Sequence, residues 1–293
     1  MENAIQKLLC DLGICREQSI QPFFPKVRDR DDISVLKCHE SDVIFLSSSE
    51  HMDMTHYQNT DSFDYWRASK RSEAVLACQE DSQRRYNQFK HLISGKKWLD
   101  VGTGSGGILD LFRPDKVEIT AVEPQMNALL ALQKDGYTAF DSIDSVSSQD
   151  FDVISLFHVL EHVTNPVDML TNLRKKLSAS GKIIIEVPHA RDFLLSKLDL
   201  NAFKAFTFWS EHLILHTQES LQVFLQEAGF KEIKINGFQR YPLSNHLYWL
   251  AKGQPGGQKH WSELNTTELD NAYSKMLDKN KATDTLIAIA SVK

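Results

Sequence analysis

The sequence predicts an α/β fold with a mostly parallel sheet, and three observations lead to that prediction. Short apolar runs alternate with helix-forming segments along residues 97–235. A glycine-rich turn, Gly102–Gly107, follows the first of these runs. The run Ile183–Val187 is rich in β-branched residues without polar alternation, which is typical of a strand buried on both faces. Alternating strands and helices place a parallel sheet between two layers of helices.

Each expected element has its own local signal. Asn165 is a good N-cap and Pro166 suits the first position of a helix. Gly136 and Gly229 lie where helices should end in a left-handed cap. Helices are expected at residues 108–112, 125–134, 166–178 and 217–229. Strands are expected at residues 98–101, 117–122, 137–140, 151–157, 183–187, 231–235 and 284–292.

The segments outside this alternation divide the chain into four parts. Residues 1–60 are irregular and predict a lid or a small β segment. Residues 61–240 form the predicted core domain, which begins with one or two helices. Residues 241–282 are too long for an inert loop and predict a partly helical cap insertion. Residues 283–293 supply the final core strand.

Composition argues against several classes of partner. The net charge of −6 gives no basic footprint for nucleic acid. No apolar run approaches the roughly 20 residues that span a bilayer, and no signal peptide is visible at the start. The four cysteines form no CxxC pair, as expected of free thiols in a reducing cytoplasm. We expect a cytoplasmic protein with a small-molecule partner and neither nucleic acid nor membrane; the oligomeric state stays open.

The glycine-rich turn is the strongest chemical signal. Glycines let the backbone turn tightly beside a ligand, and the following helix offers unpaired N–H groups. Gly102, Gly104 and Gly107 also satisfy GxGxxG, the pattern of dinucleotide-binding domains. Glu123 follows the second expected strand, where a carboxylate can accept hydrogen bonds from ribose hydroxyls. These residues alone leave open a nicotinamide cofactor, an adenosyl cofactor or a tight turn without ligand.

A family resemblance separates these alternatives. The segment Asp100–Gly106 resembles motif I of class I S-adenosylmethionine (SAM)-dependent methyltransferases, and Val122–Pro124 resembles their second-strand acidic motif. Phe151–Val163 is similar to the fourth-strand segment of a subgroup that methylates ubiquinone precursors, sugars and other small metabolites. The resemblance covers roughly residues 85–235. It implies a Rossmann-like seven-stranded sandwich with the last strand antiparallel, and SAM as the cofactor.

The resemblance also implies which side chains hold SAM. The glycine loop should bind its amino-acid end, with Asp100 near the ammonium, and Glu123 should accept the ribose hydroxyls. Asp141, with Ser142 beside it, is placed for the adenine amino group, although Asp144 is close. The expected cofactor-binding residues are Asp100, Gly102, Thr103, Gly104, Ser105, Gly106, Glu123, Pro124, Asp141, Ser142, Phe157 and His158.

Two histidines compete for the role of base. The segment Phe208–Leu213 resembles a stretch of sugar methyltransferases in which a histidine acts as base, although Trp209 replaces their tyrosine. His212 is favoured because the neighbouring Glu211 could raise its basicity. His158, at the end of the fourth strand, is the second candidate. A structural Glu-His pair under a lid helix is the alternative without catalysis.

Metal sites receive less support. His158, Glu161 and His162 form an HxxEH pattern, but no third ligand is obvious, so no metal is expected. The C-methyltransferases acting on nucleotide-linked sugars carry an N-terminal zinc module. Here the N-terminal region has only Cys10, Cys15 and Cys38, at a spacing that does not suit zinc. This departure weakens the assignment of the chain to the C-methyltransferases.

Arginines upstream of the core suggest contacts with a charged ligand. Tyr65–Arg67 could close over the SAM carboxylate. Arg71, Arg84 and Arg85 could bind an anionic substrate or form a solvated helix face.

The expected reaction is methyl transfer from SAM to a hydroxyl of a sugar, a glycan precursor or a related small metabolite. The alternatives are a C-methyltransferase acting on a nucleotide-linked sugar and a SAM-binding protein without catalysis. The acidic balance disfavours tRNA methylation, and no module for docking a protein substrate is visible.

Overall fold

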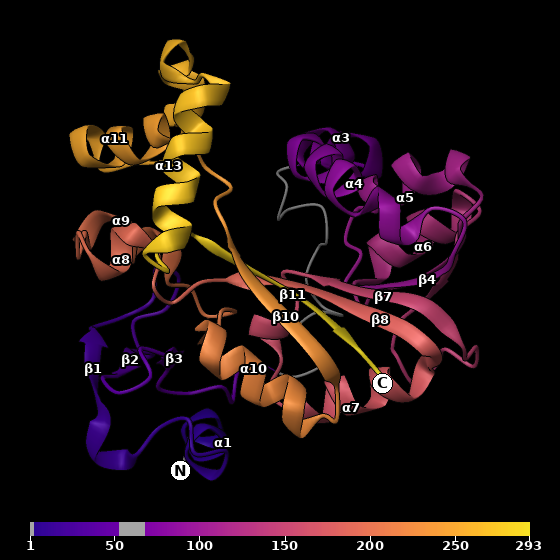
Figure 1. Ribbon diagram of the computed structural model, residues 1–293, viewed down its shortest axis with the longest axis horizontal. Coiled ribbons are helices and arrows are strands. Elements are labelled where there is room, and N and C mark those ends of the chain that lie inside the picture. Colours follow the sequence, from indigo (N-terminus) through magenta and orange to yellow (C-terminus); the bar gives the residue numbers. More distant parts are fainter. Residues whose placement is uncertain (1–2, 53–67) are drawn as a thin grey trace.

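The computed structural model describes residues 3–52 and 68–293, and within them a seven-stranded sheet forms the centre (Figure 1). The strand order is β10-β11-β8-β7-β4-β5-β6. Strand β11 runs antiparallel to both of its neighbours and the other pairs are parallel, which confirms the predicted fold class. The strands are β4 (Lys97–Val101), β5 (Glu118–Val122), β6 (Thr138–Phe140), β7 (Phe151–Phe157), β8 (Leu177–Pro188), β10 (Lys231–Phe238) and β11 (Thr285–Ser291).

Helices cover both faces of this sheet. Helices α3 to α6 lie on one face, and α7 and α10 lie on the other (Figure 1). Phe89, Phe112 and Leu132 pack in a cluster on the first face, whereas Leu170 and Phe224 belong to a separate cluster. The helices are α3 (Arg71–Ala77), α4 (Gln79–Ile93), α5 (Gly107–Phe112), α6 (Met126–Lys134), α7 (Pro166–Lys176) and α10 (Gln218–Glu227).

Strand β8 begins earlier than the sequence pattern predicted. The helix expected to reach residue 178 ends at Lys176, and Leu177 already pairs with Phe151 of β7. Gly181 lies within the strand. A Cβ atom at Gly181 would lie 2.7 Å from the carbonyl oxygen of Phe151, so only glycine permits this close approach.

The N-terminal residues build a second, smaller sheet. Within the described chain it has four antiparallel strands in the order β1-β2-β3-β9. Its last strand, β9, comes from far along the chain, directly before α10, so the N-terminal segment is fastened to the core domain. Phe208 packs edge-on against Phe23, with ring centroids 5.9 Å apart. The elements are α1 (Ala4–Asp11), β1 (Ile20–Phe24), β2 (Val35–Cys38), β3 (Ile44–Leu46) and β9 (Ile214–Leu215).

The insertion between β10 and β11 is mainly helical. It stands beyond the carboxyl ends of the strands, across from α3 and α4 (Figure 1). Trp249 is buried against Phe203, with ring centroids 5.1 Å apart, and so joins α11 to α9. The insertion contains α11 (Leu243–Lys252), α12 (Gly257–His260) and α13 (Thr267–Lys279), whereas α8 (Phe193–Ser196) and α9 (Asn201–Thr207) follow β8. In the described part of the chain, no helix is both long and apolar enough to cross a bilayer.

A buried ion network fastens α4 to the sheet. Glu186 of β8 is fully buried and accepts hydrogen bonds from Arg84 at 2.7 Å and Arg85 at 2.8 Å. Burial alone would raise the pKa of Glu186, but Arg85, His158 and Arg84 lower it well below its ordinary value of 4.5. The carboxylate is therefore ionised at neutral pH, and its contribution to stability is lost only as the pH falls below that value.

Replacing Glu186 should destabilise the fold strongly. Glu186→Gln leaves Arg84 and Arg85 without their buried counter-charge, and the free energy of unfolding should fall by about 3 kcal/mol. Urea denaturation at neutral pH measures this change. The matched control is Asp31→Asn, which breaks a pair with Lys26 whose carboxylate is 86% exposed and should change stability by less than about 1 kcal/mol. Equal stability of the two variants would contradict a structural role for the network.

Candidate active site

A cavity of about 1130 Å³ opens at the carboxyl ends of β4, β5 and β7. Ligands bind at this edge in open α/β sheets. The glycine loop and Glu123 line one half. The other half is formed by the turn after β7, by residues of the insertion and by Arg28 and Met52 of the N-terminal segment. Three separate parts of the chain therefore enclose one space.

Glu123 lies at the end of β5 and is 4% exposed. Its carboxylate accepts hydrogen bonds from the backbone N–H groups of Gly104 at 2.6 Å and Gln125 at 2.9 Å. Burial raises the pKa of Glu123 to about 7. A buried carboxylate of this kind gains from a ligand that donates hydroxyl hydrogen bonds, so the residue fits the ribose of SAM.

Asp100 lies beneath the glycine loop and not on the cavity wall. Its side chain accepts a hydrogen bond from the Ser155 hydroxyl at 2.5 Å and another from the Thr103 hydroxyl. Burial raises the pKa of Asp100 to about 6. The two hydroxyl groups hold the carboxylate under the loop. The contact with the SAM ammonium that we expected of Asp100 stays a prediction.

The remaining predicted cofactor residues fall into two groups. Gly106 does not line the cavity: its backbone is left-handed at φ 71°, and a Cβ there would lie 2.5 Å from Leu132, so it serves the turn and its packing. The Asp141 carboxylate accepts a hydrogen bond from Ser145 at 2.8 Å at the cavity edge. The predicted residues that line the cavity are Gly102, Thr103, Gly104, Ser105, Glu123, Pro124, Asp141, Ser142, Phe157 and His158.

The upstream arginines are structural. Arg71 donates a hydrogen bond to the carbonyl oxygen of Ser105 at 2.8 Å and pairs with Asp110 at 2.8 Å, so it fixes the glycine loop from behind. The pairing of Arg84 and Arg85 to Glu186 likewise shows that these side chains do not form a solvated helix face. Arg85 also lines the cavity, so its contact with an anionic substrate stays a prediction. The predicted Tyr65–Arg67 contact lies outside the described residues.

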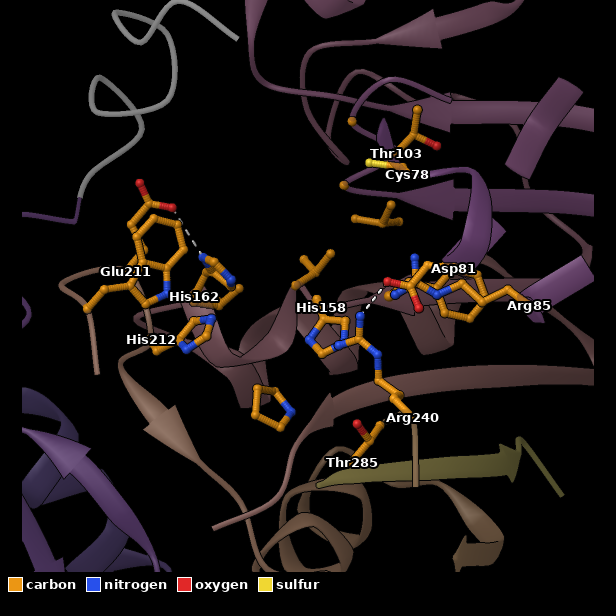
Figure 2. A pocket seen from close by; sticks show the side chains of 18 of the residues that line it. Cys78, Asp81, Arg85, Thr103, His158, His162, Glu211, His212, Arg240 and Thr285 are labelled. Atoms are coloured by element: carbon orange, nitrogen blue, oxygen red, sulfur yellow. Dashed lines mark hydrogen bonds and ion pairs between the residues drawn. The ribbon is translucent and has the colours of Figure 1, made fainter. Parts of the chain in front are cut away.

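His158 occupies the centre of the site, in the turn that follows β7 (Figure 2). Its backbone is left-handed at φ 58°, a conformation that is strained for histidine. Nδ1 lies 2.9 Å from Glu161, and Nε2 lies 3.3 Å from Glu186 and 3.0 Å from Arg240. Burial alone would lower the pKa of His158, but the two carboxylates outweigh it and raise the pKa. Both ring nitrogens are thus held by charged partners.

His212 does not have the environment that we expected for a base. The Glu211 carboxylate lies 3.5 Å from His162 (Figure 2). Burial, followed by the charge of His162, lowers the pKa of His212 to about 3. The prediction that Glu211 raises the basicity of His212 is therefore wrong, because burial and a neighbouring histidine dominate. A base works best with a pKa near the working pH.

The fold joins two histidines that are far apart in sequence. The backbone N–H of Leu213 donates to the carbonyl oxygen of Glu161 at 2.8 Å, which holds the 208–213 segment against the turn after β7. One ligand atom each from Glu161, His162 and His212 lies within 4.8 Å of the others, a grouping that could hold a metal ion. Of the three HxxEH residues only Glu161 and His162 belong to this grouping. His212, which only the fold brings near, takes the place that the sequence pattern gave to His158.

Aromatic side chains form the wall beyond the histidines. The Arg28 guanidinium lies 4.6 Å from the centre of the Trp209 ring, so the N-terminal segment closes this side. Phe206 and Trp249 line the opposite part, with ring centroids 5.3 Å apart. Sequence reasoning missed Arg28 and Arg240, which carry no motif and reach the cavity only through the arrangement of the covering segments.

Comparisons with known proteins identify the family. A family model described as a methyltransferase domain matches residues 77–235, more than half of the chain. A solved SAM-dependent methyltransferase from Thermotoga maritima, titled a possible histamine N-methyltransferase, has the same fold. Its TM-score is 0.53 at 17% identity, covering 82% of this chain and 100% of that one.

Curated relatives show local similarity. The mitochondrial ubiquinone biosynthesis O-methyltransferase of Schizosaccharomyces pombe is 28% identical over 109 residues, 33% of this chain and 39% of that protein. The tRNA U34 carboxymethyltransferase of Dichelobacter nodosus is 31% identical over 123 residues, 38% of this chain and 39% of that protein. The ubiquinone biosynthesis O-methyltransferase of Photobacterium profundum is 20% identical over 174 residues, 55% of this chain and 74% of that protein.

The first two alignments thus span about two fifths of those relatives, whereas the family model covers the sheet and the glycine loop described above. The chain belongs to the methyltransferase domain family.

Proposed function

We propose that this enzyme transfers a methyl group from S-adenosylmethionine (SAM) to a hydroxyl oxygen of a small molecule that carries a ring. The observation behind the proposal is the division of one cavity into a half with buried carboxylates and a half with histidines and aromatic rings. Two relatives are named O-methyltransferases of ubiquinone biosynthesis, which favours an aromatic hydroxyl. The sugar hydroxyl expected from the sequence has no support in those names, although aromatic walls suit the apolar face of a sugar as well.

The cofactor half would hold SAM through backbone and carboxylate groups. Glu123 binds the ribose hydroxyls, Asp100 places negative charge beneath the glycine loop, and Asp141 and Ser142 lie at the adenine end. SAM supplies a methyl group on a positively charged sulfur; the acceptor oxygen bonds to that carbon while the carbon–sulfur electron pair stays with sulfur. The protein's main contribution is alignment of the two reactants.

The acceptor half would orient the hydroxyl and keep bulk solvent away from the methyl group. His158 and His212 border this half, and Trp209 offers a ring face for stacking. The hydroxyl proton passes to a water molecule on the side of the histidines as the oxygen–carbon bond forms. Glu211 positions His162. Arg28 and Trp249, from the N-terminal segment and the insertion, act as covers over the reacting groups.

Removing the Glu123 carboxylate should weaken cofactor binding. Glu123→Ala takes a charged acceptor from the ribose hydroxyls, so the Kd for S-adenosylhomocysteine should rise by about 10-fold or more, or about 1–3 kcal/mol. Isothermal titration calorimetry measures the change. Glu118→Ala, at the exposed opposite end of β5, is the matched control and should bind as the parent does. Unchanged affinity in both variants would refute the role given to Glu123.

His212 should matter for turnover and not for cofactor binding. Its ring borders the acceptor half, so His212→Ala should lower kcat by about 100-fold, the contribution typical of a group acting at the reacting hydroxyl. Affinity for S-adenosylhomocysteine should stay the same. His39→Ala, an exposed histidine that bonds to Gln21, serves as the control. If kcat of His212→Ala equals that of the parent protein, His212 has no role at the reacting hydroxyl.

A panel of acceptors tests the proposed reaction itself. Purified protein with SAM carrying a labelled methyl group would be offered phenols and catechols with apolar substituents, nucleotide sugars, and tRNA. We expect label in the aromatic hydroxyl compounds. Label only in nucleotide sugars would favour the earlier prediction of a sugar hydroxyl as acceptor. Label only in tRNA would overturn the proposal of a small-molecule acceptor. Tight SAM binding with no transfer to any class would favour a binding protein without catalysis.

A further inference from the structure

We propose that Glu161, His162 and His212 bind a divalent transition-metal ion at the edge of the acceptor half. The three side chains place one ligand atom each within 4.8 Å of the others. Two imidazoles and one carboxylate form a donor set that zinc and related ions use in catalytic sites. His162 and His212 line the cavity, so an ion can reach them from the substrate side.

The distances are close to those of a metal site. Nε2 of His162 lies 3.8 Å from Oε1 of Glu161. Two ligands bound about 2.1 Å from one tetrahedral metal lie about 3.4 Å apart. The His162 ring and the Glu161 carboxylate are therefore close to the separation expected of two metal ligands. One nitrogen of His212 lies within 4.8 Å of a ligand atom of each, and its ring centroid lies 5.2 Å from that of His162.

The hydrogen-bond pattern around the three residues also points to an ion. Among the described residues, neither Oε2 of the fully buried Glu161 nor the buried Nδ1 of His212 has a hydrogen-bond partner. A buried polar atom without a partner is costly, and a cation bound by both atoms would remove that cost.

A carboxylate and a histidine contact the proposed ligands, as supporting groups do around known metal sites. Nδ1 of His162 faces Glu211 at 3.5 Å, while its Nε2 faces Glu161. A metal-binding histidine usually directs its second nitrogen to such a carboxylate. Nδ1 of His158 lies 2.9 Å from Oε1 of Glu161 and fixes that side chain. Glu211 and His158 are thus positioning residues for the ligands.

What the ion would do rests on the proposed function. Three protein ligands leave an open coordination position toward the cavity, where the acceptor hydroxyl oxygen would bind. Coordination lowers the pKa of a bound hydroxyl, as it does for metal-bound water. The proton passes to water, and the oxygen then forms its bond to the methyl carbon while the carbon–sulfur bond breaks.

Cobalt binding tests the site without any acceptor or turnover. The full-length protein is treated with a chelator, desalted and titrated with Co²⁺, and visible absorption reports coordination by nitrogen and oxygen. We expect saturable binding of about one ion per chain. His212→Ala and His162→Ala should lose it, and Glu211→Gln should weaken it by about 10-fold, because Glu211 supports a ligand. His39→Ala controls for binding to exposed histidines.

Each outcome has a separate meaning. Affinity for S-adenosylhomocysteine, measured on every variant, shows that the fold is intact. No saturable Co²⁺ binding by the parent protein, or parental binding in both His212→Ala and His162→Ala, would overturn the metal site. Saturable binding that depends on both histidines supports the site, even if no aromatic hydroxyl is methylated; that second result would overturn the proposed function alone.

Discussion

Desolvation of carboxylates at one edge of the central sheet is the constraint on which the site depends. Asp100, Glu123, Glu161 and Glu186 are all nearly or fully buried there. Each needs compensation, because an isolated buried charge is expensive. Asp100 accepts hydrogen bonds from hydroxyl groups, and Glu123 accepts them from backbone N–H groups. Glu186 pairs with arginines, and Glu161 pairs with histidines. These partners in turn fix the glycine loop, α4 and the turn after β7.

The two halves of the cavity differ in the groups that stabilise their buried carboxylates. Backbone and hydroxyl groups leave Glu123 and Asp100 with raised pKa values, so these residues gain from a ligand that donates hydrogen bonds or carries positive charge. The cations around Glu186 and Glu161 lower their pKa values, and both stay ionised. His158, whose backbone is strained, lies between the halves, and its imidazole ring contacts both Glu161 and Glu186. One side chain therefore couples the acceptor side to the sheet.

Local sequence patterns predicted the sheet and most of the residues that line the glycine-loop half of the cavity. Gly102 to Ser105 and Glu123 follow directly from strand ends, and parallel strands carry such residues to the same edge. The long-range contacts could not be read in this way. The pairing of β3 with β9, the binding of Arg84 and Arg85 by Glu186, and the meeting of His162 with His212 all join segments distant in sequence. Glu211 misled because adjacency in sequence does not place two side chains on the same side of a turn.

A crystal structure with S-adenosylhomocysteine bound would test the division of the cavity most directly. The account predicts both ribose hydroxyls within hydrogen-bond distance of the Glu123 carboxylate, the amino-acid end on the glycine loop above Asp100, and the sulfur facing the space between His158 and His212. A nucleoside bound against Trp209 and Trp249, with Glu123 still bonded only to Gly104 and Gln125, would contradict it.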